Sequence, residues 1–346
     1  MHLSSRRGAV FAAMTAITLA AAAGCGSSSA GTSNSPTLGN SLSSVCKQGA
    51  KEGTVNYWVS YDADTFKKEL APFEQQYPKI KVVQTAYHGE DITQKLSAES
   101  QARHPLTADL IEADIPSLSP VISARLVQPV GWTKYGVPSD QVSGSGVRTY
   151  RIPGGIAYNT KQVKASELPD TWADLINSKW AGKIIYDPRG AYLQDLAVPW
   201  GVSKADSWFS SFVKTDKPVA VQGSTSSLQQ VASGQSEIST SATSDNIKQL
   251  SAAGAPLAIK YLDVVPTLDY YAFLVKGAAH PNAAACFMAW WSGPKGVAQR
   301  VKYEDKPNAG RPVGIPASSR AVSLTTTGDA GVATKFATYI ANRSVK

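Results

Sequence analysis

Histidine and cysteine are scarce in this chain, which has four histidines and three cysteines among 346 residues. His88, His104 and His280 are scattered along the sequence, so a catalytic triad or a zinc site has little to build on. The sequence also contains no HExxH, GxSxG, Walker or CxxC pattern. These absences argue against the enzyme and metal-site classes that such motifs define.

Clustered charge is absent as well. The formal net charge is +8, but Lys and Arg are spread along the chain without a basic run interleaved with aromatic residues, which argues against a nucleic-acid partner. The chain is 43% apolar and 17% charged, as is typical of globular proteins. Its length exceeds what one ordinary core needs and suits two lobes.

A long apolar run occurs at the N-terminus, where Arg6 and Arg7 precede the apolar residues 9–23. This run is too short for a convincing membrane-spanning helix and is typical of a signal peptide. The ending Ala22-Ala23-Gly24-Cys25 resembles a bacterial lipoprotein signal. We therefore predict a signal over 1–24 and a lipid anchor on Cys25 that holds the protein at the outer face of the cytoplasmic membrane. The alternative is a secreted protein with an incidental cysteine.

Residues 25–45 are mostly Gly, Ser, Thr and Asn and are predicted to form a flexible tether. Cys46 and Cys286 are the two remaining cysteines. Because an even pair outside the membrane favours a disulfide, we expect a bridge between them. The alternative is that Cys286 is simply a small buried residue.

From Thr54 onward, apolar strand patterns alternate with helical patterns. Strands are predicted at 54–60, 80–85 and 108–113, with helices after each of them. Such alternation indicates a mostly parallel, covered sheet, in which ligands bind beyond the carboxyl ends of the strands. The loops at those ends contain Tyr61-Asp62, Tyr87-His88-Gly89 and Asp114.

The second half of the chain is predicted to begin after Ser143-Gly144-Ser145-Gly146, with a crossing strand at 156–159. Thr171 is expected to cap a short helix, and 183–186 to form a strand that enters the turn Asp187-Pro188-Arg189-Gly190. A helix is expected from Ala191. A strand, a tight turn and a helix start make a cradle of backbone N–H groups for an anion. A strong strand at 267–275 is read as the return to the first lobe.

Three segments of this region carry a family resemblance: Tyr158-Asn159-Thr160, the run 168–175 (LPDTWADL) and the run 179–184 (KWAGKI). They closely resemble the solute-binding proteins of ABC importers, in the branch with receptors for ferric iron, phosphonates, sugar phosphates and polyamines. The resemblance implies an α/β fold of the type II periplasmic binding protein class. Each lobe would be a mostly parallel sheet flanked by helices, and two crossing strands would form the hinge.

The resemblance also implies a division of the chain. Lobe 1 would comprise 46–150, with 267–310 returning to it, and lobe 2 would comprise 151–266, with 311–346 packing on it. It implies a monomer that binds a small-molecule solute and docks on ABC permease and ATPase subunits, without enzymatic activity and without a cofactor.

Candidate ligand contacts follow from the same resemblance. Arg189, Gly190 and Ala191 align with the loop at which the iron-binding branch holds its accompanying anion. Hydroxyl groups on the opposite wall, and polar groups of lobe 1, are the further candidates. These are Ser224, Thr225, Ser241, Thr243, Tyr61, Asp62 and Asp114. Each has a simpler alternative: Arg189 in a surface salt bridge, and the Asp, Ser and Thr residues as helix caps.

Ferric iron is not favoured by these residues. The iron-binding branch offers two adjacent tyrosines where this chain has Ser244-Asp245, and Tyr270-Tyr271 lies on a strand, where neighbours alternate and cannot both bind one ion. We therefore predict no metal and expect a small organic anion or zwitterion as the solute. Ferric iron, polyamine and thiamine remain alternatives.

An enzymatic alternative rests on two short patterns of penicillin-binding proteins. Ser211 and Lys214 fit S-x-x-K, and Ser244-Asp245-Asn246 fits S-D-N. The third pattern, K-T-G, is absent, and serine is abundant enough for chance matches. The sequence therefore argues against a serine hydrolase.

Overall fold

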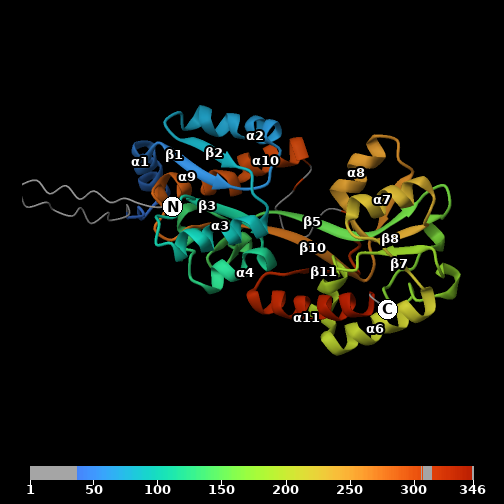
Figure 1. The fold of residues 1–346 in the computed structure, drawn as a ribbon. Coiled ribbons are helices and arrows are strands. Elements are labelled where there is room, and N and C mark those ends of the chain that lie inside the picture. The colour runs from blue at the N-terminus through green and yellow to red at the C-terminus, as the bar shows by residue number, and fades with distance from the viewer. Residues whose placement is uncertain (1–36, 305, 307–313, 345–346) are drawn as a thin grey trace, which may run out of the picture. The chain divides into compact units, whose positions relative to one another are not determined.

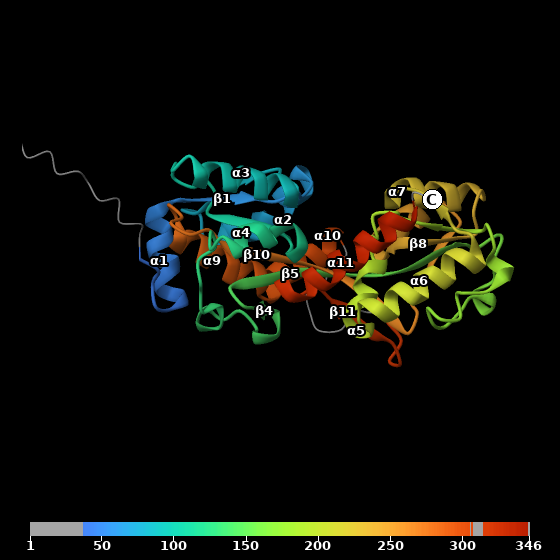
Figure 2. The same ribbon diagram turned by 60° about the horizontal axis from the view of Figure 1, so that its bottom comes forward.

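The structure is a computed structural model that describes residues 37–304, 306 and 314–344 (Figures 1 and 2). Cys25 and the predicted signal lie outside the described residues. The first lobe is built on the parallel strands β2 (Lys81–Thr85), β1 (Thr54–Trp58) and β3 (Leu110–Asp114). Its helices are α1 (Leu42–Glu52), α2 (Ala63–Gln76), α3 (Gly89–Gln101), α4 (Ile115–Ser123), α9 (Pro281–Ser292) and α10 (Pro294–Glu304).

The second lobe is built on β8 (Ile238–Thr243), β6 (Ile184–Tyr186) and β7 (Val219–Ala220), which are also parallel. Its helices are α5 (Ala197–Trp200), α6 (Val202–Asp216), α7 (Ser224–Ser233) and α8 (Ser244–Ala252). It also contains the short 3-10 helices η3 (Ala165–Glu167), η4 (Ser178–Trp180) and η5 (Leu193–Leu196), whereas η1 (Trp132–Tyr135) and η2 (Ser139–Gln141) belong to the first lobe. Both lobes thus have the mixed α/β architecture expected from the alternating pattern.

Two long antiparallel strands join the lobes (Figure 1). β5 (Gly146–Asn159) pairs with β10 (Val264–Leu274) up to Pro153, and from Gly154 onward it pairs with β8 and β9 (Leu257–Lys260). β10 in turn pairs with β3. The edge strands β4 (Val142–Ser143) and β11 (Arg320–Ser323) pair with β5 and β10. The crossing strand therefore starts ten residues before the predicted position at Ile156.

Each lobe has its own hydrophobic core on both faces of its sheet. In the first lobe, one cluster contains Phe66 and Phe73 of α2 with Phe287 of α9, and another contains residues of α3 and α4. In the second lobe, one cluster contains Trp172 and Phe209, and another lies under α7 and α8. Separate cores are what two lobes joined by strands require.

α1 begins inside the segment 25–45 that was predicted to be a flexible tether. Its first residue is Leu42, and Ser41 caps it by accepting a hydrogen bond from the Ser44 N–H. A disulfide joins Cys46 on α1 to Cys286 on α9, with Cα atoms 4.9 Å apart. The bridge therefore ties the N-terminal helix to the first-lobe core.

The predicted helix at Thr171 is wrong: residues 171–175 form turns, not a helix. The Thr171 side chain is used locally, where it donates to Asp174 Oδ2 and accepts from the Asp174 N–H. Trp172 is buried and donates to the Val264 carbonyl, 2.7 Å away. Tertiary packing of this tryptophan decides the local conformation.

α11 (Thr327–Ser344) packs on α6 and α5 of the second lobe and also on α4 of the first. Phe336 and Ile340 belong to a second-lobe core cluster, whereas Ala330 belongs to a first-lobe cluster. The C-terminal helix therefore contacts both lobes. Among the described residues, no helix combines the length and apolar character that a membrane span needs.

Candidate functional site

Two cavities, each of about 410 Å³, lie at the carboxyl ends of the strands and share Asp114 and Tyr270. One is lined by Asp114, Pro116, Arg189, Ala191, Tyr192, Gln194, Asp195, Thr267, Leu268, Asp269, Tyr270 and Leu324. The other is lined by Ser60, His88, Gly89, Glu90, Asp91, Ala113, Asp114, Ser117 and Tyr270. We call their union the cleft. Its walls come from both lobes and from β10, and its size suits a small ligand.

Arg189 lines the cleft from the second lobe, as expected, but the turn that carries it is occupied by a side chain. The buried carboxylate of Asp187 accepts the Arg189 N–H at 2.9 Å, the Gly223 N–H at 2.9 Å, and Arg189 Nε and Nη2 at 3.1 and 2.7 Å. Burial opposes ionisation, but these bonds outweigh it and lower the pKa of Asp187. Asp187 thus already occupies part of the predicted cradle, and a ligand role for the turn stays a prediction.

The ion pair fixes the direction of the Arg189 guanidinium. Asp187 takes the Nε–Nη2 edge, and the side chain remains 58% exposed. The hydrogen bond to Asp187 comes first among the causes that raise the pKa of Arg189, and the charge of Glu90 on α3 adds to it. Arg189 is thus a held cation whose remaining donors are available to a ligand.

The first-lobe candidates have structural roles. Asp62 caps α2 by accepting the Thr65 N–H, and Asp114 caps α4 by accepting the Ser117 N–H and hydroxyl at 3.0 and 2.9 Å. Asp114 lines the cleft; Asp62 does not. Tyr61 points into the first-lobe core, where its hydroxyl donates to the buried Glu112 at 2.5 Å. The Tyr61 hydroxyl is therefore already used inside the core, and its ligand role stays a prediction.

The predicted hydroxyl wall does not line the cleft. Ser224 and Thr225 start α7, and Ser241 and Thr243 are buried in β8.

The backbone of Gly190 has φ +84°, and a Cβ there would lie 3.1 Å from Ala337 of α11. The glycine is thus required by the turn and by the close approach of the C-terminal helix.

Tyr192 was missed by the sequence analysis. It is one of four non-glycine residues with positive φ among those described, at φ 64°, and it lines the cleft. A Cβ on Gly154 of β5 would lie 3.2 Å from its ring, so the ring packs against the crossing strand. Burial raises the pKa of Tyr192 to about 12, despite a hydrogen bond with Ser224. A strained residue at a site of this kind often marks function.

Asp195 was also missed. It lies in η5, is only 6% exposed, and lines the cleft. Burial, followed by the charges of Asp114 and Asp269, raises the pKa of Asp195 well above its usual value. An aspartate within the apolar run Leu193–Ala197, directly after the turn, was the available sequence signal.

The three aspartates of the cavity that contains Arg189 differ in how their charges are compensated. Asp269 on β10 forms a bidentate pair with Arg151, with distances of 2.7 and 2.5 Å. Asp114 accepts two hydrogen bonds from Ser117. Among the described residues, no three His, Cys, Asp or Glu side chains are arranged to hold a metal ion.

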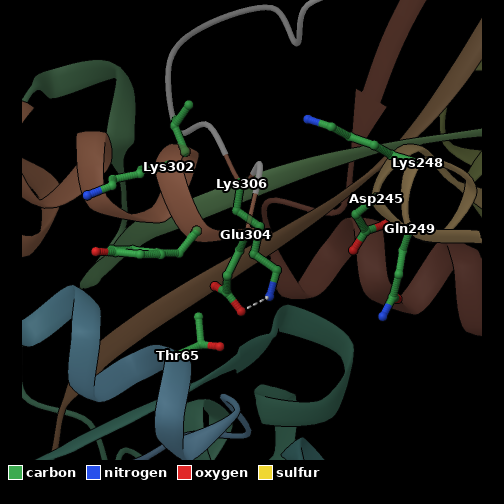
Figure 3. Close-up of a pocket in the computed structure, with 9 residues that line it drawn as sticks. Thr65, Asp245, Lys248, Gln249, Lys302, Glu304 and Lys306 are labelled. Atoms are coloured by element: carbon green, nitrogen blue, oxygen red, sulfur yellow. Dashed lines mark hydrogen bonds and ion pairs between the residues drawn. The ribbon is translucent and has the colours of Figure 1, made fainter. Parts of the chain in front are cut away.

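A further cavity, of about 460 Å³, lies between α2, α8 and the end of α10 (Figure 3). Asp245, Lys248 and Gln249 of α8 form one side, and Glu304 and Lys306 are joined by a 3.0 Å ion pair on the other. It shares no lining residue with the cleft, and long charged side chains dominate it. The cleft, with its strand-end residues, is the better ligand site.

Comparison with known proteins gives a consistent result. The model of a family described as bacterial extracellular solute-binding protein matches residues 68–308. Among solved structures, the iron- and citrate-bound IdiA (FutA) of Trichodesmium has a TM-score of 0.68 at 20% identity, covering 84% of this chain and 98% of that one. Iron-bound HitA of Pseudomonas aeruginosa has a TM-score of 0.66 at 16% identity, with coverages of 84% and 98%.

A third solved structure binds an organic compound. AgtB of A. tumefaciens, in complex with agropinic acid, has a TM-score of 0.60 at 19% identity and covers 83% of this chain and 98% of that one. At these identities the likeness shows the fold alone. No curated protein matches this chain in sequence.

Proposed function

Since the chain belongs to the family of bacterial extracellular solute-binding proteins, and is thus the substrate-binding protein of an ABC importer, we propose that its solute is a small organic anion or zwitterion held in the cleft. Proteins of this family bind and deliver solutes and are not enzymes. We further propose that the protein is a monomer and is held at the outer face of the membrane by a lipid on Cys25.

The observation that carries this proposal is the position of Arg189. Its guanidinium is held on one edge by Asp187 and lines a cavity whose other walls include Asp114 of the first lobe. A guanidinium fixed in this way offers charge-assisted hydrogen bonds to a carboxylate or phosphonate at little entropic cost. A solute that contacts both lobes binds the closed form better and shifts the population toward it.

Arg189→Ala tests the proposal. We expect the affinity for the acidic solutes that stabilise the wild type in a thermal-shift screen to fall at least tenfold, because one charge-assisted contact is lost. Arg189→Lys keeps the charge but not the fork and should lose part of that affinity. Lys161→Ala, on the exposed surface of the second lobe, is the matched control.

The screen should contain phosphonates, sugar phosphates, amino-carboxylates, polyamines, thiamine and ferric citrate. Equal binding of every stabilising acid by the wild type and by Arg189→Ala, measured by calorimetry, would refute the role of Arg189. Ferric citrate is included because two structurally similar proteins bind iron.

A further inference from the structure

Asp195 is a buried residue of the cleft whose carboxylate has no compensating partner within the described part of the protein. Its side chain is 6% exposed, and among the described residues no hydrogen bond or ion pair reaches its carboxylate. Other buried aspartates all have donors: Asp109 from Asn56 and His280, Asp187 from Arg189 and Gly223, Asp216 from Asn177, and Asp269 from Arg151. An unpaired carboxylate in such a position destabilises the ligand-free protein.

The neighbours of Asp195 increase this cost. Asp114 and Asp269 both repel its negative charge, and Asp269 alone is neutralised, by Arg151. Arg189 lies on the same wall, but the Nε–Nη2 edge of its guanidinium already pairs with Asp187. The field at this end of the cleft therefore favours a positive charge.

Part of the remaining lining is apolar, and the rest comes from Gln194, Thr267 and two tyrosines. Pro116, Ala191, Leu268 and Leu324 line the same cavity as Asp195 and Arg189. Such a surface suits the methylene stem of a short aliphatic compound, with one charged group at each end.

We propose that Asp195 and Asp114 together bind a protonated amine of the solute, which makes the transported compound an aminoalkyl acid rather than a simple anion. The proposal rests on the proposed function and names its substrate class. An ammonium group supplies three donors, and the Asp114 carboxylate, with only Ser117 bound, keeps acceptor capacity. Because Asp195 belongs to the second lobe and Asp114 to the first, the amine would bridge the two walls.

A metal ion is a weaker occupant of the same place. The described residues contain no group of three ligating side chains close enough for one ion, and Asp269 is committed to Arg151. An ammonium needs no such closed coordination sphere, since two carboxylates and an apolar stem site suffice.

The test compares matched compounds on matched variants. The proteins are the wild type, Asp195→Asn and, as control, Asp170→Asn, whose side chain is 83% exposed in the second lobe. The compounds are 4-aminobutanoate with butanoate and butylamine, 2-aminoethylphosphonate with ethylphosphonate and ethylamine, and ferric citrate. Calorimetry gives each affinity, and circular dichroism verifies the fold of each variant.

We expect at least one amino acid of the set to bind the wild type at least tenfold more tightly than its amine-free analogue. Asp195→Asn should lose at least tenfold in affinity for that compound and change little for the analogue, while Asp170→Asn binds as the wild type does. The proposal is overturned if the amine makes no difference to the wild type, if Asp195→Asn binds the amino compound normally, or if ferric citrate alone binds.

The same compounds, measured also on Arg189→Ala, separate this proposal from the one above. If amines bind without an acid group, and their affinity depends on Asp195 but not on Arg189, then the solute does not need the proposed acid group. The proposal of an amine site at Asp195 is then supported. If acids bind through Arg189 and the amine is dispensable, the amine site is wrong and the organic-anion proposal stands.

Discussion

At the scale of single residues, Glu69 on α2 is a second buried carboxylate without compensation. Its side chain is fully buried, and neither oxygen has a hydrogen-bond partner among the described residues. Burial, and then the charge of Glu304, raise the pKa of Glu69 to about 8, although Arg300 and Lys306 oppose the shift. The folded protein therefore holds a proton there that the unfolded chain releases near pH 4.5.

The sign of the pH dependence follows. The contribution of Glu69 to stability is fully present below the unfolded pKa of 4.5 and is lost as the pH rises through about 8. Glu69→Gln does not titrate, so its advantage over the wild type should grow between pH 5 and 9, to on the order of 3 kcal/mol. Denaturant unfolding at several pH values measures this difference.

A control on the same helix makes this prediction specific. Glu74 is partly exposed and pairs with Lys81 at 3.4 Å, so Glu74→Gln removes the same charge from α2 without the buried site. Stability curves for Glu69→Gln and the wild type that stay parallel from pH 5 to 9 would show that Glu69 is not protonated in the folded protein.

Residue-level prediction from the sequence succeeded where the signal is local. Asp114 and Arg189 follow strands directly, so their place at the carboxyl edge of the sheet can be read from the pattern. The sequence pattern could not predict that the Asp187 side chain occupies the turn or that Asp195 is buried. Both features depend on Gly223, β10 and α11, which are remote in sequence.

At the scale of elements, the disulfide is the covalent link between two helices that are distant in the chain. Cys46 and Cys286 are separated by 240 residues, and closing so long a loop restricts the unfolded chain most. We expect the double variant Cys46→Ala/Cys286→Ala to lose about 2–5 kcal/mol of stability, seen as a lower midpoint in denaturant.

Reductant supplies the control for that measurement. It should lower the midpoint of the wild type to near that of the double variant and leave the double variant unchanged. A wild type that is insensitive to reductant under unfolding conditions, together with an unchanged midpoint in the variant, would show that the bridge contributes nothing to stability.

The crossing strand shows why element boundaries are harder to predict than element types. Pro153-Gly154-Gly155 interrupts the apolar alternation of β5, which hides the first half of the strand in the sequence. In the structure this interruption is where β5 leaves β10 and joins β8, with an irregular register that Gly and Pro tolerate. The break in pattern marked the passage between lobes, not the start of a strand.

At the scale of the whole molecule, the two-lobed architecture was predictable because length, alternation and the resemblance all pointed to it. β5 and β10 connect the sheets, and α11 contacts both lobes. The exact boundaries between lobes stay a prediction, because the C-terminal helix shares its packing between the two.

In the proposed scheme, a single residue determines the cellular location of the protein. A lipid on Cys25 would hold the receptor beside its permease, where the effective concentration greatly exceeds that of a free protein. Cys25→Ser should therefore move the full-length protein from the membrane fraction to the soluble extracellular fraction, as followed by immunoblot.

Binding must be unaffected by that change if the anchor acts only on location. Purified Cys25→Ser protein should bind the same solutes with the same affinity as the wild type, since the cleft residues lie between Ser60 and Leu324. Uptake by cells at low solute concentration should fall, because captured solute diffuses away before it reaches the permease. A Cys25→Ser protein that stays in the membrane fraction would mean that something other than a lipid on Cys25 retains it.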